Sequence, residues 1–101
     1  MTEKKLPSRP IVFDWDLGNQ LKNWQKHEVD YTECEEVFLV NNKNIITFFD
    51  EKHSISEQRW LALGITEKNR KLSIFFTIRN KKIRVISARD MSKKEKKLYE
   101  K

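Results

Sequence analysis

The sequence has 101 residues, of which 38% are hydrophobic and 11% aromatic, enough for one folded domain but not for two. Its single cysteine, Cys34, excludes a disulfide framework and zinc sites built from several cysteines, and no apolar run approaches the ~18–20 residues that span a bilayer. The formal net charge of +6 permits a nucleic-acid partner, and a charged N-terminus without the apolar core of a signal peptide predicts a cytoplasmic protein.

Charge is distributed unevenly along the chain. Residues 11–36 carry seven acids and two lysines, a net charge of −5, whereas residues 57–91 carry nine bases and three acids, a net charge of +6. This polarity suggests two faces with different partners. Solvated surface charge with basic tails explains it equally well.

A basic leader and a short strand come first in the chain. Residues 1–10 have no structural period, so we expect a flexible basic leader before a single domain over residues 11–101. The alternation in the next five residues, IVFDW, predicts a strand over residues 11–15.

A helix is predicted next. Asp16 is a suitable N-cap for a helix that ends near Glu28. Leu17, Leu21 and Trp24 are spaced by four and three residues and therefore share one face of this helix. We expect most aromatic side chains at such periodic positions to belong to the core.

A second helix follows after a short break. Asp30 and Glu33 form the acidic version of a capping box, which marks its beginning. Its apolar side carries Tyr31, Cys34, Val37 and Phe38. We expect the two helices to form a compact pair joined around Val29, with Cys34 as a core thiol whose acidic neighbours disfavour the thiolate.

The second half of the chain reads mainly as β-structure. Strands are predicted over residues 44–50, 57–66, 72–79 and 82–89, and a polar loop over residues 50–56 holds His53. Ser92 and Glu95 form another capping box, which begins a C-terminal helix. This order predicts an α+β fold: an antiparallel sheet of about four to five strands, two helices from the N-terminal half and a C-terminal helix, all packed on one face.

The last two strands predict a hairpin whose register can be counted from its turn. Asn80-Lys81 suits a two-residue turn because Asn tolerates positive φ. The count pairs Ile78 with Ile83, Phe76 with Val85 and Ile74 with Ser87 on the face toward the helices. It pairs Thr77 with Arg84 and Arg79 with Lys82 on the opposite face, so Arg79 and Arg84 converge near one end of the sheet. These arginines either grip a phosphate or simply protect a solvated face.

Other candidate groups each have a plain structural alternative. Glu57 and Arg59 lie two apart, which on a strand places them on one face as a general base and a cationic clamp, or as a surface ion pair. Lys26 and His27 end the first helix, where positive charge suits the helix dipole. His53 is a proton carrier or a loop brace. Two histidines and no acids at ligand spacing predict no metal site.

Three motifs lie in a fixed order along residues 11–100. Phe13-Asp14-Trp15-Asp16 is followed by Asn23, Lys26-His27, Val29 and Tyr31-Thr32-Glu33. The central motif is His53-Ser54-x-Ser56-Glu57-x-Arg59-Trp60 with Leu63-Gly64. The closing motif is Ile83 to Arg89, then Lys94-Glu95 and Leu98-Tyr99. Together they resemble the BrnT family of ribonuclease toxins from type II toxin–antitoxin systems.

The resemblance implies a RelE-like fold and an endoribonuclease that inhibits translation, without a metal ion or organic cofactor. It implies a BrnA antitoxin with a ribbon-helix-helix part, a heterotetrameric complex, and contact with DNA only through the antitoxin. Carried over by position, the active groups are Lys26, His27, Glu57, Arg59, Arg79, Arg84 and Arg89. The sequence departs from the family at Asn19, where Lys is frequent, and at Glu28, where Gly is common after Lys-His.

The expected chemistry is attack of the RNA 2′-hydroxyl on the adjacent phosphate, with Glu57 or His27 as the base. Arg59, Arg84 and Arg89 are the expected clamps and Lys26 a further cation. The alternatives are a non-catalytic interaction module, or a co-repressor component of a toxin–antitoxin complex, and, less favoured, a repressor that binds DNA alone. An antitoxin helix over the basic sheet face is favoured slightly over a basic antitoxin segment on the acidic helices.

Overall fold

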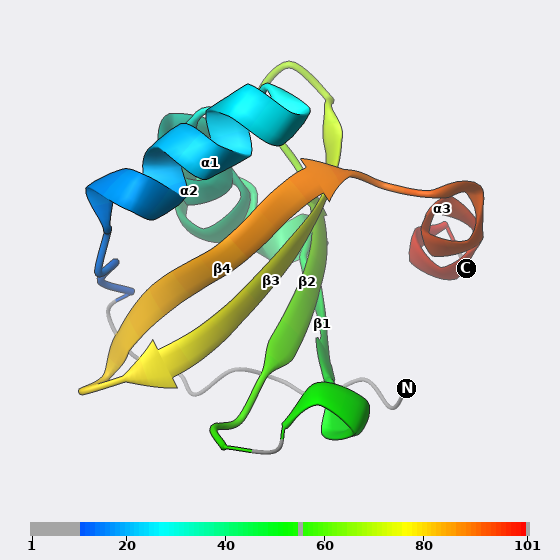
Figure 1. The fold of residues 1–101 in the computed structure, drawn as a ribbon. Helices are drawn as coiled ribbons and strands as arrows, with labels where there is room; N and C mark the ends of the chain where they lie inside the picture. Colours follow the sequence, from blue (N-terminus) through cyan, green and yellow to red (C-terminus); the bar gives the residue numbers. More distant parts are fainter. Residues whose placement is uncertain (1–10, 55, 101) are drawn as a thin grey trace.

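The computed structural model describes residues 11–54 and 56–100, and its elements follow the predicted order (Figure 1). The elements are helices α1 (Leu17–His27) and α2 (Tyr31–Leu39), strands β1 (Ile46–Phe49), β2 (Trp60–Ile65), β3 (Lys71–Arg79) and β4 (Lys82–Asp90), and helix α3 (Lys93–Tyr99). Single-turn 3₁₀ helices at Asn42–Asn44 and Glu51–His53 flank β1. The α+β class is confirmed. The leader predicted at residues 1–10 lies outside the described residues.

The four strands form one antiparallel sheet in the order β1-β2-β3-β4. Successive side chains on each strand point to opposite faces, so the sheet has two apolar faces. One packs against α2, where Val37 and Phe38 belong to the same buried cluster as Ala62 and Phe76, and the Phe38 and Phe76 rings meet edge to face. The other holds Leu61, Leu63, Phe48 and Met91, with Tyr99 of α3 against them. The expectation that all helices share one face is therefore wrong, because α3 lies on the side of the sheet opposite α1 and α2 (Figure 1).

Three predicted strands are shorter than expected, and one of them, β1, covers only Ile46–Phe49 of the predicted residues 44–50. The strand over residues 11–15 is reduced to a single parallel bridge between Phe13 and Ile83, because the chain turns away into the Asp16 cap. Strand β2 begins at Trp60 rather than at residue 57. The Ser54 hydroxyl accepts the Arg59 backbone N–H at 2.9 Å, which takes that amide out of the ladder. Residues 57 and 59 consequently do not share a strand face.

The β3–β4 hairpin has the predicted turn but contains an unpredicted bulge. Asn80 and Lys81 both have positive φ, 51° and 64°, as a two-residue turn requires, and Thr77 pairs with Arg84. A register shift between Phe75 and Phe76 then leaves one extra residue in β4, so Ile74 pairs with Ala88 instead of Ser87. The shift re-aims the end of β4 and pairs Arg89 with Ser73.

Helix α1 covers the exposed edge of β4 with polar side chains. The Asn19 side-chain amide donates to the Val85 carbonyl at 3.2 Å, and the Asn23 side-chain oxygen accepts the Ala88 amide at 3.1 Å. These bonds pair backbone groups that an edge strand leaves open. The apolar side of α1 therefore faces outward, and Trp24, expected in the core, is 53% exposed.

Strand β2 and helix α2 approach each other most closely at Gly64. A Cβ atom added there would lie 2.5 Å from Val37 Cγ1, well inside van der Waals contact. We predict that Gly64→Ala lowers the free energy of unfolding by about 1–3 kcal/mol through overpacking. This corresponds to a fall in Tm of about 4–8 °C per kcal/mol for a domain of this size. Thermal unfolding measures it.

A double variant tests whether the loss of stability arises from the close contact between residue 64 and Val37. Adding Val37→Ala to Gly64→Ala removes the clashing methyl groups, so the two substitutions together should cost less than the sum of their separate effects. Strict additivity of the two losses would contradict the close contact.

Candidate functional site

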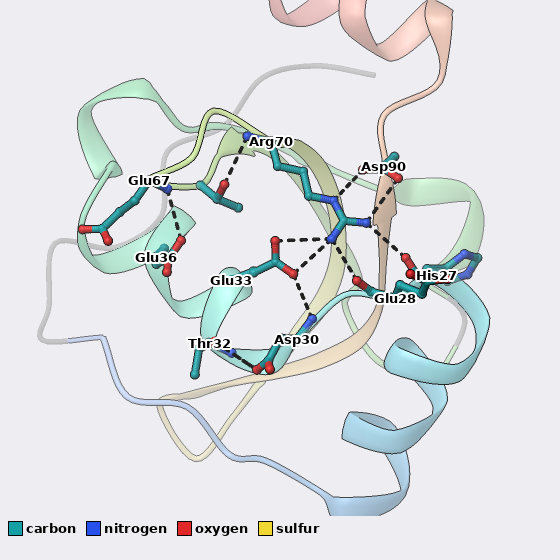
Figure 2. Close-up of polar contacts among 10 residues, drawn as sticks. His27, Glu28, Asp30, Thr32, Glu33, Glu36, Glu67, Arg70 and Asp90 are labelled. Atoms are coloured by element: carbon teal, nitrogen blue, oxygen red, sulfur yellow. Dashed lines mark hydrogen bonds and ion pairs between the residues drawn. The ribbon is translucent and has the colours of Figure 1, made fainter.

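One arginine joins the ends of three elements (Figure 2). Arg70 lies just before β3, and its guanidinium donates to both carboxylate oxygens of Asp90 at the end of β4, at 2.7 and 3.2 Å. It also donates to Glu33 of α2 at 3.0 Å. The carbonyls of His27 and Glu28 accept from it at 3.1 and 2.9 Å. All three guanidinium nitrogens are thus used.

This cluster also explains how α1 ends. Glu28 has a left-handed backbone, with φ of 53°, and closes the helix as its C-cap. Carbonyl oxygens at a helix C-terminus carry partial negative charge, which a guanidinium neutralises. Hydrogen bonds to Asp90 raise the pKa of Arg70, and the same contact lowers the pKa of Asp90. Arg70 is therefore a permanently charged brace between α1, α2 and β4.

Beside this brace, three of the seven predicted site residues line one pocket. Lys26, His27 and Arg89 surround a volume of about 510 Å³ together with Glu28, Arg70 and Asp90. The His27 imidazole points away from the Arg70 guanidinium (Figure 2). Among residues 11–54 and 56–100, no hydrogen bond engages the imidazole or the Lys26 ammonium. This pocket combines an imidazole ring, three cations and two anions.

Arg89 is held in place on the face of the sheet by Glu95 and Phe75. Its guanidinium donates to both Glu95 carboxylate oxygens, at 2.6 and 2.8 Å, and lies 5.5 Å from the centre of the Phe75 ring. Burial alone raises the pKa of Glu95. Hydrogen bonds from Arg89, the Ser92 amide and the Ser73 hydroxyl outweigh that effect and lower it to about 2.

Arg59 shares the aromatic ring with Arg89. Its guanidinium carbon lies 5.4 Å from the centre of the Phe75 ring, at a distance typical of a cation–π contact. The Arg59 Nε atom is buried, and within the described part of the chain it has no hydrogen-bond partner. Phe75 thus places two cations on the sheet face opposite α1 and α2.

The remaining predicted groups lie at the other end of the hairpin. Arg79 donates to both carboxylate oxygens of Glu57, at 2.9 and 3.2 Å. Arg84 pairs with Asp16 at 3.1 Å and with Asp14 at 3.6 Å. Ser73, the partner of Arg89, and Arg79 are six residues apart on β3, or about 20 Å. The seven predicted residues therefore form two groups, with Arg59 nearer the Arg89 group.

Other groups singled out from the sequence have structural roles. The His53 imidazole and the buried Asp50 carboxylate are 2.9 Å apart, which braces the loop after β1. Cys34 is buried in the main core, and desolvation raises the pKa of its thiol to about 12. Among the described residues, no three His, Cys, Asp or Glu side chains are grouped to hold a metal ion. No described helix is long and apolar enough to cross a membrane.

Two residues of the site were missed by reasoning from the sequence. Arg70 stands in a polar turn, and its partners lie 20, 37 and 42 residues away. No local signal marks it. Phe75 belongs to an ordinary apolar strand pattern, and only its position between Arg59 and Arg89 distinguishes it.

The Arg70 brace makes a testable contribution to stability. We predict that Arg70→Met lowers the free energy of unfolding by about 2–3 kcal/mol, because it leaves Asp90, Glu33 and two carbonyls without their donor. Denaturant unfolding measures the loss. The matched control is Arg79→Met, which breaks a single exposed pair and should change stability by less than about 1 kcal/mol. Equal losses in the two variants would contradict the role of Arg70.

The Glu95 pair predicts a pH dependence. The lowered pKa of Glu95 means that its contribution is fully present above about pH 4.5 and is lost as the pH falls toward 2. We expect Glu95→Gln to cost on the order of 1–2 kcal/mol at pH 7, less than full linkage because the pair is partly solvated. The difference from the parent should shrink below pH 4.5. A difference that is constant from pH 7 to 2 would refute it.

A family model described as the ribonuclease toxin BrnT of type II toxin–antitoxin systems matches residues 15–95. This range includes α1, α2, the whole sheet and the pocket residues. No curated protein sequence matches the chain.

Proposed function

Because the chain belongs to the BrnT family, the ribonuclease toxins of type II toxin–antitoxin systems, we propose that it is an endoribonuclease that cleaves RNA through the RNA's own 2′-hydroxyl group. The family supplies the activity class. The finer steps, the residues and the partner below are our proposal.

The reaction exchanges one phosphate ester for another. A base takes the proton of the 2′-hydroxyl while its oxygen attacks the adjacent phosphorus. The bond from phosphorus to the 5′-oxygen breaks, and an acid returns a proton to that oxygen. The products are a 2′,3′-cyclic phosphate and a free 5′-hydroxyl. Side-chain bases and cations suffice for these steps, so we propose a reaction that needs no metal ion.

His27 is the proposed group for proton transfer. The pocket that it shares with Lys26 and Arg89 is the observation that carries the proposal. An imidazole accepts and returns protons near neutral pH, and no hydrogen bond in the described part of the chain occupies this ring. Glu57, the other candidate base, accepts from Arg79 with both carboxylate oxygens and is held at the far end of the hairpin.

Arg89 and Lys26 are the proposed cations at the phosphate. A guanidinium stays charged and offers several donors to the developing phosphorane. Glu95 and Phe75 fix the orientation of Arg89, so little ordering remains to be done when RNA binds. Arg59, over the same ring, is the proposed contact for a neighbouring phosphate. Arg79 and Arg84 belong to the other end of the hairpin, where carboxylates pair with both guanidinium groups, and we propose no contact with the RNA there.

Two positions of α1 and its C-cap depart from the pattern that the family resemblance implies. Glu28 stands where the family commonly has Gly, and Asn19 where Lys is frequent. Glu28 adopts the left-handed C-cap conformation that favours glycine, with φ of 53°, and its carbonyl oxygen accepts a hydrogen bond from the Arg70 guanidinium. Asn19 bonds to the β4 backbone instead of offering a cation.

In the cell, we propose a cytoplasmic toxin that inhibits translation by cleaving RNA. A BrnA-like antitoxin with a ribbon-helix-helix part would neutralise it in a heterotetrameric complex. The toxin would meet operator DNA only through that antitoxin. The family assignment implies an antitoxin partner, and the net charge of +1 over residues 11–91 is compatible with indirect contact to DNA.

The two groups of candidate residues can be separated by substitution. We predict that His27→Ala lowers the rate of RNA cleavage about 10²–10⁴-fold, the usual effect of losing a general base. Lys26→Met should lower the rate more modestly. Glu57→Gln and Arg79→Met are the matched controls and should keep at least about one third of the parent rate, because they lie about 20 Å away. Single-turnover cleavage of a short RNA in EDTA, with the cyclic phosphate identified by mass, measures all four.

Two results would contradict the assignment. One is a fully active His27→Ala variant together with an inactive Glu57→Gln variant, which moves the site to the far end of the hairpin. The other is growth arrest in cells that persists after every candidate base and arginine is replaced, which supports the non-catalytic interaction module.

A further inference from the structure

Helix α1 presents a continuous apolar row to the outside. Leu17, Leu21 and Trp24 have exposed fractions of 69%, 50% and 53%. Residues separated by four and three positions are neighbours on a helix surface, so the three side chains form one ridge about two turns long. The ridge is called the α1 row below.

The α1 row is held outward by the opposite side of the same helix. Asn19 and Asn23 bind the backbone of β4, which fixes the rotation of α1 about its axis. Asp16 accepts the Gly18 and Asn19 amides at the start of the helix, and Arg70 holds the carbonyls at its end. With both ends and one side anchored, α1 cannot roll its apolar row into the core. The polar inner face and apolar outer face are the reverse of the usual arrangement for a surface helix.

The charges around the α1 row indicate what kind of partner fits it. Carboxylates lie at both ends: Asp14 and Asp16, which share the single cation of Arg84, precede the helix, and Glu28 and Asp30 follow it. Successive residues of a helix are rotated by about 100°, so Lys22 points roughly 100° or more away from each residue of the row. It therefore does not offset the negative charge of the carboxylates beside the row. A helix that buries the row would therefore be apolar along one side and basic at its flanks.

We propose that the α1 row is the docking site for an amphipathic, basic-flanked helix of the cognate antitoxin. This rests on the proposed function in one respect, the existence of a protein antitoxin in a type II system. The occupant needs apolar side chains at the spacing i, i+3 or i+4, i+7 to match the row. A docking site on the α1 row places the antitoxin on the acidic helices rather than over the basic sheet face, because apolar area is exposed on α1.

The position of the row also accounts for inhibition. Trp24 and His27 are three residues apart and therefore neighbours on the surface of α1. A helix that covers Trp24 borders the pocket lined by Lys26, His27 and Arg89. Binding at the α1 row thus obstructs the access of RNA to the pocket without requiring the antitoxin to occupy it.

The test compares two leucines of equal exposure. Leu21→Lys alters the α1 row, and Leu39→Lys, at the end of α2, is its control, with exposed fractions of 50% and 49% in the parent. The probe is the purified protein encoded by the reading frame next to the toxin gene, titrated by calorimetry against each variant. We expect Leu21→Lys to weaken binding roughly 10- to 100-fold, the cost of losing one buried leucine contact. Leu39→Lys should leave the affinity within about twofold of the parent value. Adding Trp24→Lys to Leu21→Lys should weaken binding further.

Cleavage of RNA is measured on the same preparations and should be unchanged in both single variants. Equal affinity of Leu21→Lys and Leu39→Lys for the probe would overturn the proposal, as would a probe that does not bind the parent chain. A parent chain that is dimeric in sedimentation and becomes monomeric on Leu21→Lys would also overturn it, because a second copy then occupies the row. A parent chain that binds the probe but does not cleave RNA would instead contradict the proposed activity, since binding is measured independently of cleavage.

Discussion

The guanidinium group of Arg70 is the interaction on which the arrangement of the candidate site depends. It joins the last carbonyls of α1, the Glu33 carboxylate of α2 and the Asp90 carboxylate at the end of β4. Hydrogen bonds to charged groups contribute about 1.5–3 kcal/mol each when well formed, and less where solvent reaches them. Because His27 supplies one of the carbonyls and Asp90 follows Arg89, the same contacts set the position of the helix end relative to the strand end. The pocket is the space that remains between them.

Two departures from regular structure on β4 determine how Arg89 is oriented on the sheet and which side of α1 is exposed. The bulge after Val85 turns Arg89 toward Phe75 and Glu95, where an unbroken ladder would pair it with Leu72 on the helix side. The open edge of the same strand is covered by asparagines of α1, and this covering sends the apolar row of α1 outward. A cationic sheet face and an apolar helix face thus have a common origin in how β4 is paired.

The features that the sequence predicted correctly are those set by nearby residues. Asp16, Asp30 and Ser92 begin helices because a side-chain oxygen reaches amides two or three positions away. The Asn80-Lys81 turn fixed its own register for the pairs next to it. The wrong expectations needed distant partners. The Arg70 brace and the outward row of α1 depend on contacts across 20 to 66 residues, and helical spacing alone does not say which face meets the sheet. The bulge lies nearer, within the hairpin, but beyond the pairs whose register the turn determines. The seven predicted site residues form two separate groups for the same reason. Arg79 and Arg89 belong to one hairpin but lie at opposite ends of it.

We propose that a phosphodiester binds between the end of α1 and Arg89, rather than at the far end of the hairpin. The most direct test is a nuclear magnetic resonance titration with a short RNA that carries a single 2′-deoxy position and so resists cleavage there. The side-chain signals of His27 and Arg89 should shift in a saturable manner, while those of Arg79 should stay within their unbound values. Saturable shifts at Arg79 with no change at His27 would contradict the claim.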